Sequence, residues 1–396
     1  MSDEKPSPDA SLDTETRLTH LGRDPEHHFG FVNLPVYRGS TILYPSVEAI
    51  EKKDLQYTYG RRGTPLVRAL EEAVTELENG HGSVLAPSGL NAIACTLLGL
   101  LKAGDHILVT DSVYQPARKI CDGLLKRLGI ETEYYDPRAG GAIAERLRDN
   151  TRLIYTETPG SQTFEMQDLP AISAAAQGRD IFVIADNTWA TPLYCNPLEL
   201  GADVVIHAGT KYFGGHSDAN LGSITANERT YPLIKAAHGD MGVCPGPEDV
   251  FLCLRGLRTL AVRLARHNEA ALEMARWLKG RAEVARVLHP ALEDDPGHAL
   301  WRRDFRGASG LFSVVLNSVP HEAVAAMLDG LKLFGMGFSW GGFESLVIPF
   351  DPSSYRSATT WAAEGPALRF FIGLENTDDL KADLDAGFAR LRKAAG

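Results

Sequence analysis

The sequence predicts an α/β fold: a mostly parallel sheet with helices on both faces, followed by a smaller C-terminal α+β domain. From about residue 64 to residue 226, short apolar runs alternate with helical patterns, which is typical of parallel strands joined by helical crossovers. Beyond residue 250 the alternation ends, and a long helical pattern precedes separated strands. We therefore expect an N-terminal arm over residues 1–63, a first domain over 64–255 and a second domain over 256–396.

The expected elements follow from local signals. Thr64 can cap a helix that has Pro65 at its first position, and Gly80 ends that helix. In the first domain we predict strands over 83–86, 107–110, 132–135, 153–156, 181–185 and 204–206, and a buried helix over 90–101. In the second domain we predict a helix over 247–278, strands over 312–316 and 345–348, and an amphipathic helix over 377–393.

The arm before residue 64 is too irregular to form a core by itself. It should lie across another surface, which in an oligomer could belong to a neighbouring chain. It ends at residues 57–63, YTYGRRG, where Arg61 and Arg62 stand beside tyrosines. A solvated loop is one interpretation of these arginines, and a clamp for an anion is the other.

Composition argues against several classes of protein. The formal net charge of −11 disfavours binding to nucleic acid and to anionic membranes. The five cysteines occur singly without a CxxC pair, so the sequence predicts neither a zinc site nor a disulfide framework. Residues 1–16 read as a polar, mobile tail that lacks the features of a signal peptide, and no apolar run reaches membrane-spanning length. We expect a cytoplasmic enzyme.

Two polar residues follow strand-like runs in the first domain. The run 181–185 leads to Asp186, and the run 203–206 leads through 208–210 to Lys211. Successive parallel strands end at one edge of a sheet, so both side chains should reach one ligand. A lysine can hold an aldehyde cofactor as a Schiff base, and an aspartate can keep a pyridine nitrogen protonated. Either residue alone has an ordinary explanation, a helix cap or a solvated loop, but the pair indicates pyridoxal phosphate chemistry on an amino acid.

A phosphate site is predicted where the strand at 83–86 turns into the next helix. Backbone N–H groups at a helix start can bind an anion, and Gly89 allows close approach. The chain has neither a GxGxxG fingerprint after a strand nor a GxxxxGK[ST] loop, so dinucleotide and nucleoside triphosphate binding lack their usual support.

Five ordered segments occur along the chain: 59–61 (YGR), 88–89 (SG), 186–188 (DNT), 210–218 (TKYFGGHSD) and 255–260 (RGLRTL). Together they resemble the transsulfuration enzymes related to cystathionine γ-synthase, and the resemblance covers nearly all of the chain after about residue 15. It implies a fold-type I enzyme that uses pyridoxal 5'-phosphate, with the cofactor bound in the domain over 64–255. It also implies a homo-oligomer with shared active sites, a tetramer built from dimers.

The resemblance implies a role for each candidate residue. Lys211 would bind the cofactor and then carry the substrate Cα proton, Asp186 would hold the pyridine nitrogen, and Tyr114 would stack on the ring. The phosphate would contact Gly89, Leu90 and Thr210, together with Tyr59 and Arg61 of a neighbouring subunit. Ala208 stands where many relatives have serine, so one phosphate contact is expected to be missing.

The segment 338–345, FSWGGFES, is similar to that of bacterial cystathionine β-lyases, and Pro116 stands where methionine γ-lyases carry cysteine. Ser339 and Trp340 would then contact substrate, and Arg369 would bind its α-carboxylate; a strand arginine paired with Glu375 is the alternative. The resemblance implies β-elimination from cystathionine to homocysteine, pyruvate and ammonia, in methionine biosynthesis. γ-Lyase or γ-synthase chemistry is the nearest alternative. A regulator that binds pyridoxal phosphate without turnover is a distant one, because no basic DNA-binding module is present.

Overall fold

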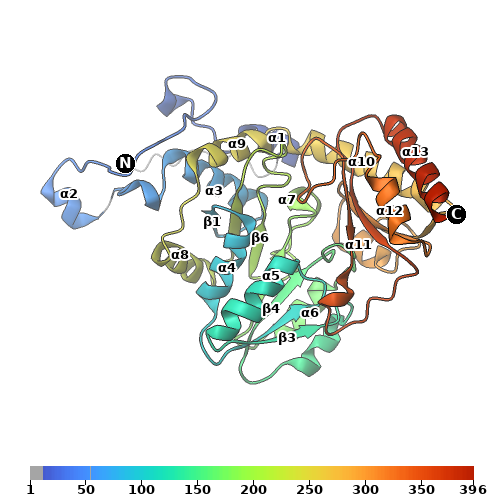
Figure 1. The fold of residues 1–396 in the computed structure, drawn as a ribbon. Helices are drawn as coiled ribbons and strands as arrows, with labels where there is room; N and C mark the ends of the chain where they lie inside the picture. Colours follow the sequence, from blue (N-terminus) through green and yellow to red (C-terminus); the bar gives the residue numbers. More distant parts are fainter. Residues whose placement is uncertain (1–11, 54) are drawn as a thin grey trace.

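Two sheets of different kinds organise the chain (Figure 1). The computed structural model describes residues 12–53 and 55–396. Residues 1–11 of the expected tail lie outside the described residues, whereas residues 14–16 belong to the first helix, α1 (Thr14–His20). The predicted combination of an α/β sheet with a smaller α+β domain is confirmed.

The large sheet has seven strands in the order β1-β7-β6-β5-β4-β2-β3. Their bounds are β1 Gly82–Ala86, β2 His106–Thr110, β3 Glu131–Tyr135, β4 Thr151–Glu157, β5 Phe182–Asp186, β6 Val204–His207 and β7 Gly222–Ala226. Strands β3, β2, β4, β5 and β6 run parallel, so their carboxyl ends meet at one edge.

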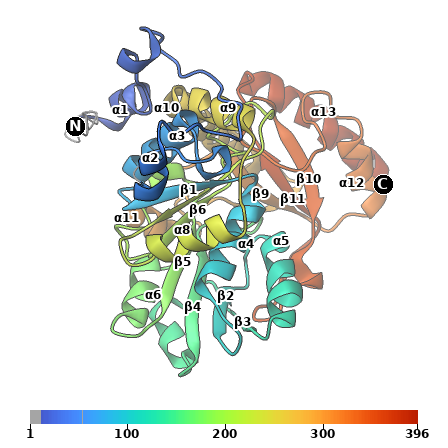
Figure 2. The ribbon, with the colours of Figure 1, turned by 90° about the vertical axis from the view of Figure 1, so that its left-hand side faces the viewer.

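Both faces of the large sheet are covered. Ile107 and Val109 of β2 point into one core cluster and Leu108 points into another, as the alternation along a strand requires. Helices α4 (Gly89–Leu100) and α8 (Tyr231–Asp240) lie on one face, in front of the sheet in Figure 2. Helix α6 (Leu169–Ala176) supplies residues to the cluster on the other face.

The first helices begin as predicted. Helix α3 (Pro65–Leu77) starts after Thr64, whose hydroxyl accepts a hydrogen bond from the N–H of Val67 at 3.3 Å. Ser88 caps α4 in the same way, by accepting from the N–H of Asn91 at 3.1 Å. The remaining short helices before residue 247 are α2 Val47–Lys52, α5 Gln115–Lys119 and α7 Thr191–Tyr194.

Strand β7 was not predicted from the sequence. It runs antiparallel between β1 and β6, and its short run GSITA carries no periodic apolar signal. A Cβ atom at Gly222 would lie 2.3 Å from the carbonyl oxygen of Ser88, so glycine lets β7 approach the start of α4. Strand β1 has β7 as its sheet neighbour, and the turn predicted to bind phosphate is therefore held by a segment far along the chain.

The C-terminal sheet is antiparallel, with the order β10-β11-β9-β8. Its strands are β8 Val284–Leu288, β9 Leu311–Leu316, β10 Leu346–Phe350 and β11 Ala367–Phe371, and its helices are α11 His298–Asp304, α12 His321–Leu328 and α13 Thr377–Ala395. Leu380 and Phe388 of α13 pack with Phe370 of β11 in one apolar cluster. The domain limits at residues 63 and 255 remain predictions.

The helix predicted over 247–278 is two helices, α9 (Pro247–Leu257) and α10 (Leu260–Lys279). The break follows Gly256, where a Cβ atom would lie 2.0 Å from the carbonyl oxygen of Phe213. The Arg263 guanidinium donates to the carbonyl oxygen of Gly256 at 2.8 Å and to that of Tyr212 at 2.8 Å. Tertiary contacts at this point therefore replace the continuous backbone ladder, which periodicity alone could not reveal.

Arg258, at the same break, anchors the start of the N-terminal arm. Its guanidinium donates to the carbonyl oxygens of Leu18 at 2.8 Å and Leu21 at 2.5 Å, and so binds the end of α1. Beyond this anchor the arm extends away from both sheets (Figure 1, blue). Phe29 and Leu43 of the arm are 96% and 86% exposed, so they leave apolar surface open to a partner.

Candidate active site

A cavity of about 460 Å³ opens where the parallel strands end, against the loop over residues 338–340 of the C-terminal domain. The structure brings to it most of the predicted site residues: Gly89, Leu90, Tyr114, Asp186, Thr210, Lys211, Ser339, Trp340 and Arg369. Tyr59 and Arg61 do not line this cavity.

Asp186 is the last residue of β5 and lies deep in the cavity wall. Its Oδ1 accepts from the N–H of Thr188 at 2.9 Å and from the Thr188 hydroxyl at 2.5 Å. Burial raises the pKa of Asp186, while these hydrogen bonds act in the opposite direction. The Thr188 hydroxyl in turn accepts from the N–H of Ala208, so Thr188 ties together the ends of β5 and β6. Sequence reasoning did not single out this residue.

Lys211 follows β6 by one short turn and faces the same cavity. Its Nζ donates to the Ser339 hydroxyl at 2.5 Å and lies 5.4 Å from the centre of the Trp340 ring. Burial and then the charge of Arg369 lower the pKa of Lys211, Asp186 opposes both, and the pKa comes to about 8. A substantial neutral fraction near physiological pH makes this amine suitable as a nucleophile and a base.

Arg369 lies in β11 and reaches the cavity from the C-terminal domain. Its Nη2 donates to the carbonyl oxygen of Ser339 at 2.9 Å, and its buried Nε has no partner among the described residues. Glu375, the acid weighed as its partner, instead accepts from the N–H and the hydroxyl of Ser345. Burial lowers the pKa of Arg369 to about 10. An unpaired guanidinium N–H in this wall fits a carboxylate ligand.

Tyr114 precedes α5, and its ring lines the cavity at 43% exposure. Its N–H donates to Oε2 of Glu157 at 2.7 Å. Glu157 ends β4 opposite Asp186 and also lines the cavity. Burial and then the Asp186 charge raise the pKa of Glu157 well above its ordinary value. Glu157 is a second site residue that sequence reasoning missed, although its position at a strand end, like that of Asp186, is a signal that could have found it.

The proposed phosphate end of the cavity is the start of α4. The first N–H groups of a helix are not used by its own ladder, so those of Gly89 and Leu90 are suited to an anion. A Cβ atom at Gly89 would lie 2.6 Å from the Cβ of Ala208, so these small residues pack directly against each other. The Thr210 hydroxyl contacts both the N–H and the carbonyl oxygen of Leu221.

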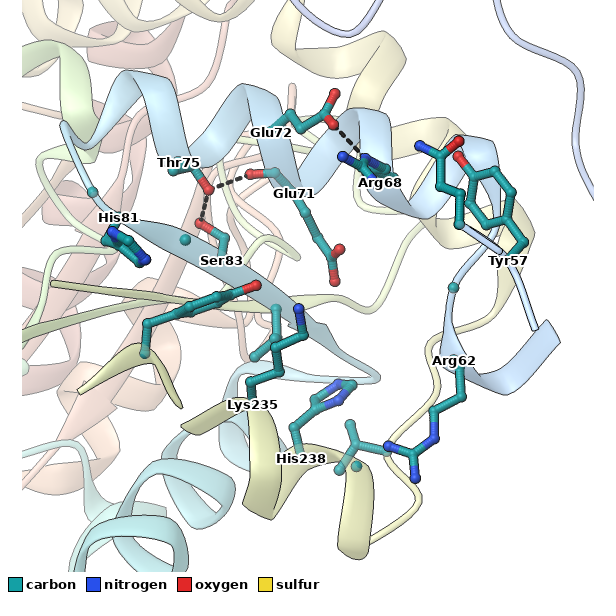
Figure 3. Close-up of a pocket in the computed structure, with 18 of the residues that line it drawn as sticks. Tyr57, Arg62, Arg68, Glu71, Glu72, Thr75, His81, Ser83, Lys235 and His238 are labelled. Carbon is teal, nitrogen blue, oxygen red and sulfur yellow. Dashed lines mark hydrogen bonds and ion pairs between the residues drawn. The ribbon is translucent and has the colours of Figure 1, made fainter. Parts of the chain in front are cut away.

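A second cavity, of about 630 Å³, lies between α3 and α8, and Arg61 and Arg62 line it (Figure 3). Glu71 from α3 points toward Lys235 from α8 across this space. Arg61 donates to the carbonyl oxygen of Gly239 at 3.2 Å, on the rim. Burial raises the pKa of Glu71 to about 7. Within one chain, the predicted phosphate ligand Arg61 therefore belongs to a different cavity from Lys211.

The first cavity fits pyridoxal phosphate by the chemistry of its groups. It offers an amine with a lowered pKa on Lys211, a buried carboxylate on Asp186 and a helix start at Gly89 for the phosphate. The Tyr114 ring adds a surface for stacking.

Comparison with known proteins identifies the family. Residues 15–389 match the family described as Cys/Met metabolism PLP-dependent enzyme. A Rhizobium johnstonii protein that carries the provisional name cystathionine beta-lyase is 52% identical, covering 94% of this chain and 95% of its own. Cystathionine beta-lyase MetC of Escherichia coli is 41% identical, covering 97% and 99%.

A solved structure is similar over the same extent. Cystathionine gamma synthase of Xanthomonas oryzae pv. oryzae, crystallised with cystathionine, superposes with a TM-score of 0.88 at 32% identity, covering 96% of this chain and 99% of that one. These findings confirm the predicted enzyme family and the predicted cofactor. The chain belongs to the Cys/Met metabolism family of pyridoxal-phosphate-dependent enzymes.

Proposed function

We propose that the enzyme cleaves the Cβ–S bond of cystathionine and releases homocysteine, pyruvate and ammonia. The observation that carries this proposal is the convergence of Lys211, Asp186 and Arg369 on one cavity beneath the loop 338–340. Relatives that share nearly the full length of the chain and bear the name cystathionine beta-lyase support it. Supply of homocysteine for methionine biosynthesis in the cytoplasm is part of the same proposal.

Arg369 orients the substrate. Two nitrogens of its guanidinium lie at one wall of the cavity: Nε, which has no partner among the described residues, and Nη2, which already donates to the carbonyl oxygen of Ser339. Both provide N–H donors for the α-carboxylate. Holding the carboxylate there fixes which Cα bond stands perpendicular to the cofactor plane. Ser339 and Trp340, which contact the Lys211 amine, then lie beside the side chain of the substrate.

Lys211 moves the proton. Its neutral amine takes the proton from Cα, and loss of homocysteine thiolate from Cβ follows. The thiolate then takes up a proton, and the remaining three-carbon amino acid takes up one water and gives pyruvate and ammonia. Pyridoxal phosphate, when bound, supplies the electron sink that makes Cα acidic. Asp186 would keep the ring nitrogen protonated, and Thr188 holds the carboxylate in place. Tyr114 holds the ring plane by stacking.

Completion of the site by a neighbouring subunit is also proposed. Tyr59 and Arg61 lie outside the Lys211 cavity of their own chain, and the exposed apolar arm offers a surface for a second copy. In a dimer in which each subunit supplies Tyr59 and Arg61 to the site of the other, these two residues would reach a Lys211 cavity and the exposed arm would be covered. Two such dimers would form the proposed tetramer.

Product analysis with purified protein, pyridoxal phosphate and cystathionine tests the reaction. Pyruvate with homocysteine is the expected outcome. 2-Oxobutanoate with cysteine would identify γ-lyase chemistry, and consumption of cysteine with an activated homoserine would identify γ-synthase chemistry. Absence of any keto acid from a protein that is yellow with bound cofactor would favour the non-catalytic regulator. Chiral analysis of the unreacted cystathionine in the same assay separates elimination from simple return of the Cα proton.

A further inference from the structure

A segment of the C-terminal domain crosses to the large sheet beside the active-site cavity. This strap, residues 355–359, lies between β10 and β11, and in Figures 1 and 2 the red-orange chain after β10 descends to the side of α5. None of its residues lines the Lys211 cavity. Its hydrogen bonds nevertheless go to two segments that carry part of the cavity wall: residues 111–118, which include the start of α5, and the loop 160–165.

Asp111 binds the C-terminal part of the strap by accepting hydrogen bonds. This carboxylate lies just past β2, is fully buried, and accepts from the N–H groups of Ser357 at 3.0 Å, Ala358 at 3.2 Å and Thr359 at 2.7 Å. The Thr359 hydroxyl adds a bond at 2.6 Å, and Arg118 completes the set at 2.6 Å. Burial opposes the charge of Asp111, but these hydrogen bonds outweigh it and lower its pKa.

Arg118 connects Asp111 to the residue proposed to stack on the cofactor. It lies in the first turn of α5, and its N–H and that of Ala117 both donate to the carbonyl oxygen of Tyr114. Glu157 holds the N–H of Tyr114 on the other side. The backbone of Tyr114 is therefore held by Glu157 on one side and, through Arg118, by Asp111 on the other, and the strap keeps Asp111 in place.

Arg356 of the strap binds the second segment, the loop 160–165. Its guanidinium donates to Glu165 at 2.7 and 3.2 Å and to the Thr163 hydroxyl at 2.5 Å. Gln162 and Phe164 of this loop line the cavity with positive φ angles of 65° and 59°. Non-glycine residues persist in this region only where surrounding contacts determine the backbone. The Arg356 bonds are such contacts, and the bond from the Tyr355 hydroxyl to Gln162 at 3.0 Å is another.

We propose that the strap positions the wall of the active site, with Asp111 setting Tyr114 through Arg118 and Arg356 setting the loop 160–165. Both are positioning residues, since neither lines the cavity. This inference rests on the proposed function of the cavity. Through the strap, the C-terminal domain would influence how the cofactor is held as well as how the substrate binds. Asp111 should act mainly on the cofactor ring, and Arg356 mainly on the part of the pocket that receives the distal end of the substrate.

Asp111→Asn and Arg356→Gln test the proposal in the loaded full-length enzyme. Misplacement of about 1 Å can cost roughly a hundredfold in rate, so Asp111→Asn should lower kcat by roughly ten- to a hundredfold and change the visible circular dichroism of the bound cofactor. Arg356→Gln should raise KM for cystathionine by a similar factor and leave the visible signal nearly unchanged. Hydrogen exchange should rise over 112–118 in the first variant and over 160–165 in the second.

A matched control exists in the chain. Arg303 of α11 also joins the two domains, by ion pairs with Asp168, and neither residue lines the Lys211 cavity or bonds the strap. Arg303→Gln should leave kcat, KM, visible dichroism and exchange over both loops unchanged. If Asp111→Asn does not fold, Thr359→Val removes one bond to Asp111 and should give the same changes in smaller size.

The outcomes separate this proposal from the proposed reaction. Unchanged dichroism and unchanged exchange over 112–118 in Asp111→Asn would overturn the role of the strap, even if the wild-type enzyme makes pyruvate. Local exchange and dichroism changes of the expected kind would support it, even if product analysis showed γ-chemistry. Equal effects from Arg303→Gln would also overturn it, because they would reflect general loosening of the domains.

Discussion

The Lys211 cavity and the cavity between α3 and α8 differ in how their ionisable groups are placed. The smaller one collects groups from the ends of neighbouring parallel strands and from a loop of the C-terminal domain, and its wall hydroxyls bind them: Ser339 contacts Lys211, and Thr188 contacts Asp186. The larger one has Glu71 and Lys235 on facing helices (Figure 3). Burial acts in both, lowering the pKa of Lys211 to about 8 and raising that of Glu71 to about 7. Convergence of groups on one point, rather than volume, therefore marks the candidate active site.

The largest expected effect comes from replacing the amine of the smaller cavity. Lys211→Ala should lower kcat by roughly 10²- to 10⁴-fold or more, because loss of a general base alone costs that much. It should also abolish the visible absorbance of the resting enzyme. Lys235→Ala, the lysine of the larger cavity, is the matched control and should retain the absorbance. A yellow Lys211→Ala protein with wild-type turnover would make the comparison between the cavities wrong.

Asp186→Ala should have the next largest effect. Removing the charge proposed to face the ring nitrogen should lower kcat by roughly a hundredfold, as does loss of one preorganised electrostatic group elsewhere. Cofactor should still bind through Lys211 and the start of α4. Thr188→Val removes the hydroxyl that donates to Asp186 and keeps the charge, so its effect on kcat should be smaller. Steady-state kinetics and cofactor titration measure both, and near-normal turnover of Asp186→Ala would mean that another group holds the nitrogen.

Arg61 tests whether the two cavities meet in the assembly. Arg61→Ala should weaken cofactor binding by roughly tenfold to a hundredfold, since a hydrogen bond to a charged group contributes about 1.5–3 kcal/mol. At a cofactor concentration that leaves Arg61→Ala largely unloaded, mixing it with Lys211→Ala protein should recover activity, because a hybrid dimer would contain one site with both defects and one with neither. Verified subunit exchange without recovery would place Arg61 at its own chain's site.

The smallest effect on turnover is expected in the larger cavity. Glu71→Gln should leave kcat unchanged and alter only the pH dependence of stability. Between its ordinary pKa of 4.5 and about 7, the folded wild type binds more protons than the unfolded chain, so its free energy of unfolding should fall as pH rises. Glu71→Gln should lack this component. Urea unfolding at several pH values across that window measures it, and parallel curves for the two proteins would show that Glu71 ionises normally.

The sequence predicted the edge of the large sheet well. Asp186 and Lys211 follow apolar runs whose periodicity is local, so their place at one edge followed from the rules of parallel sheets. Ser339, Trp340 and Arg369 were found through family resemblance, because their approach to Lys211 depends on how two domains pack.

What could not be predicted depends on contacts between distant segments. The break between α9 and α10 arises where Gly256 touches the backbone of Phe213, and the seat of Asp111 is built from residues 246 to 248 positions later. No local pattern encodes either contact. Glu157 is a different case, since its strand-end position was visible and only its pairing with Tyr114 was hidden.

The place of β7 in the large sheet also sets an order of events during synthesis. Gly82 pairs with Ala226, so β1 cannot pair with β7 until about 144 more residues have been synthesised. Such distant pairing makes a chain slow to close, and an unpaired β1 is a free edge in the meantime. The helix start at Gly89 follows β1 directly and touches Gly222 of β7 through Ser88. We therefore expect nascent chains shorter than about 226 residues to lack affinity for phosphate, and early cofactor capture to be impossible.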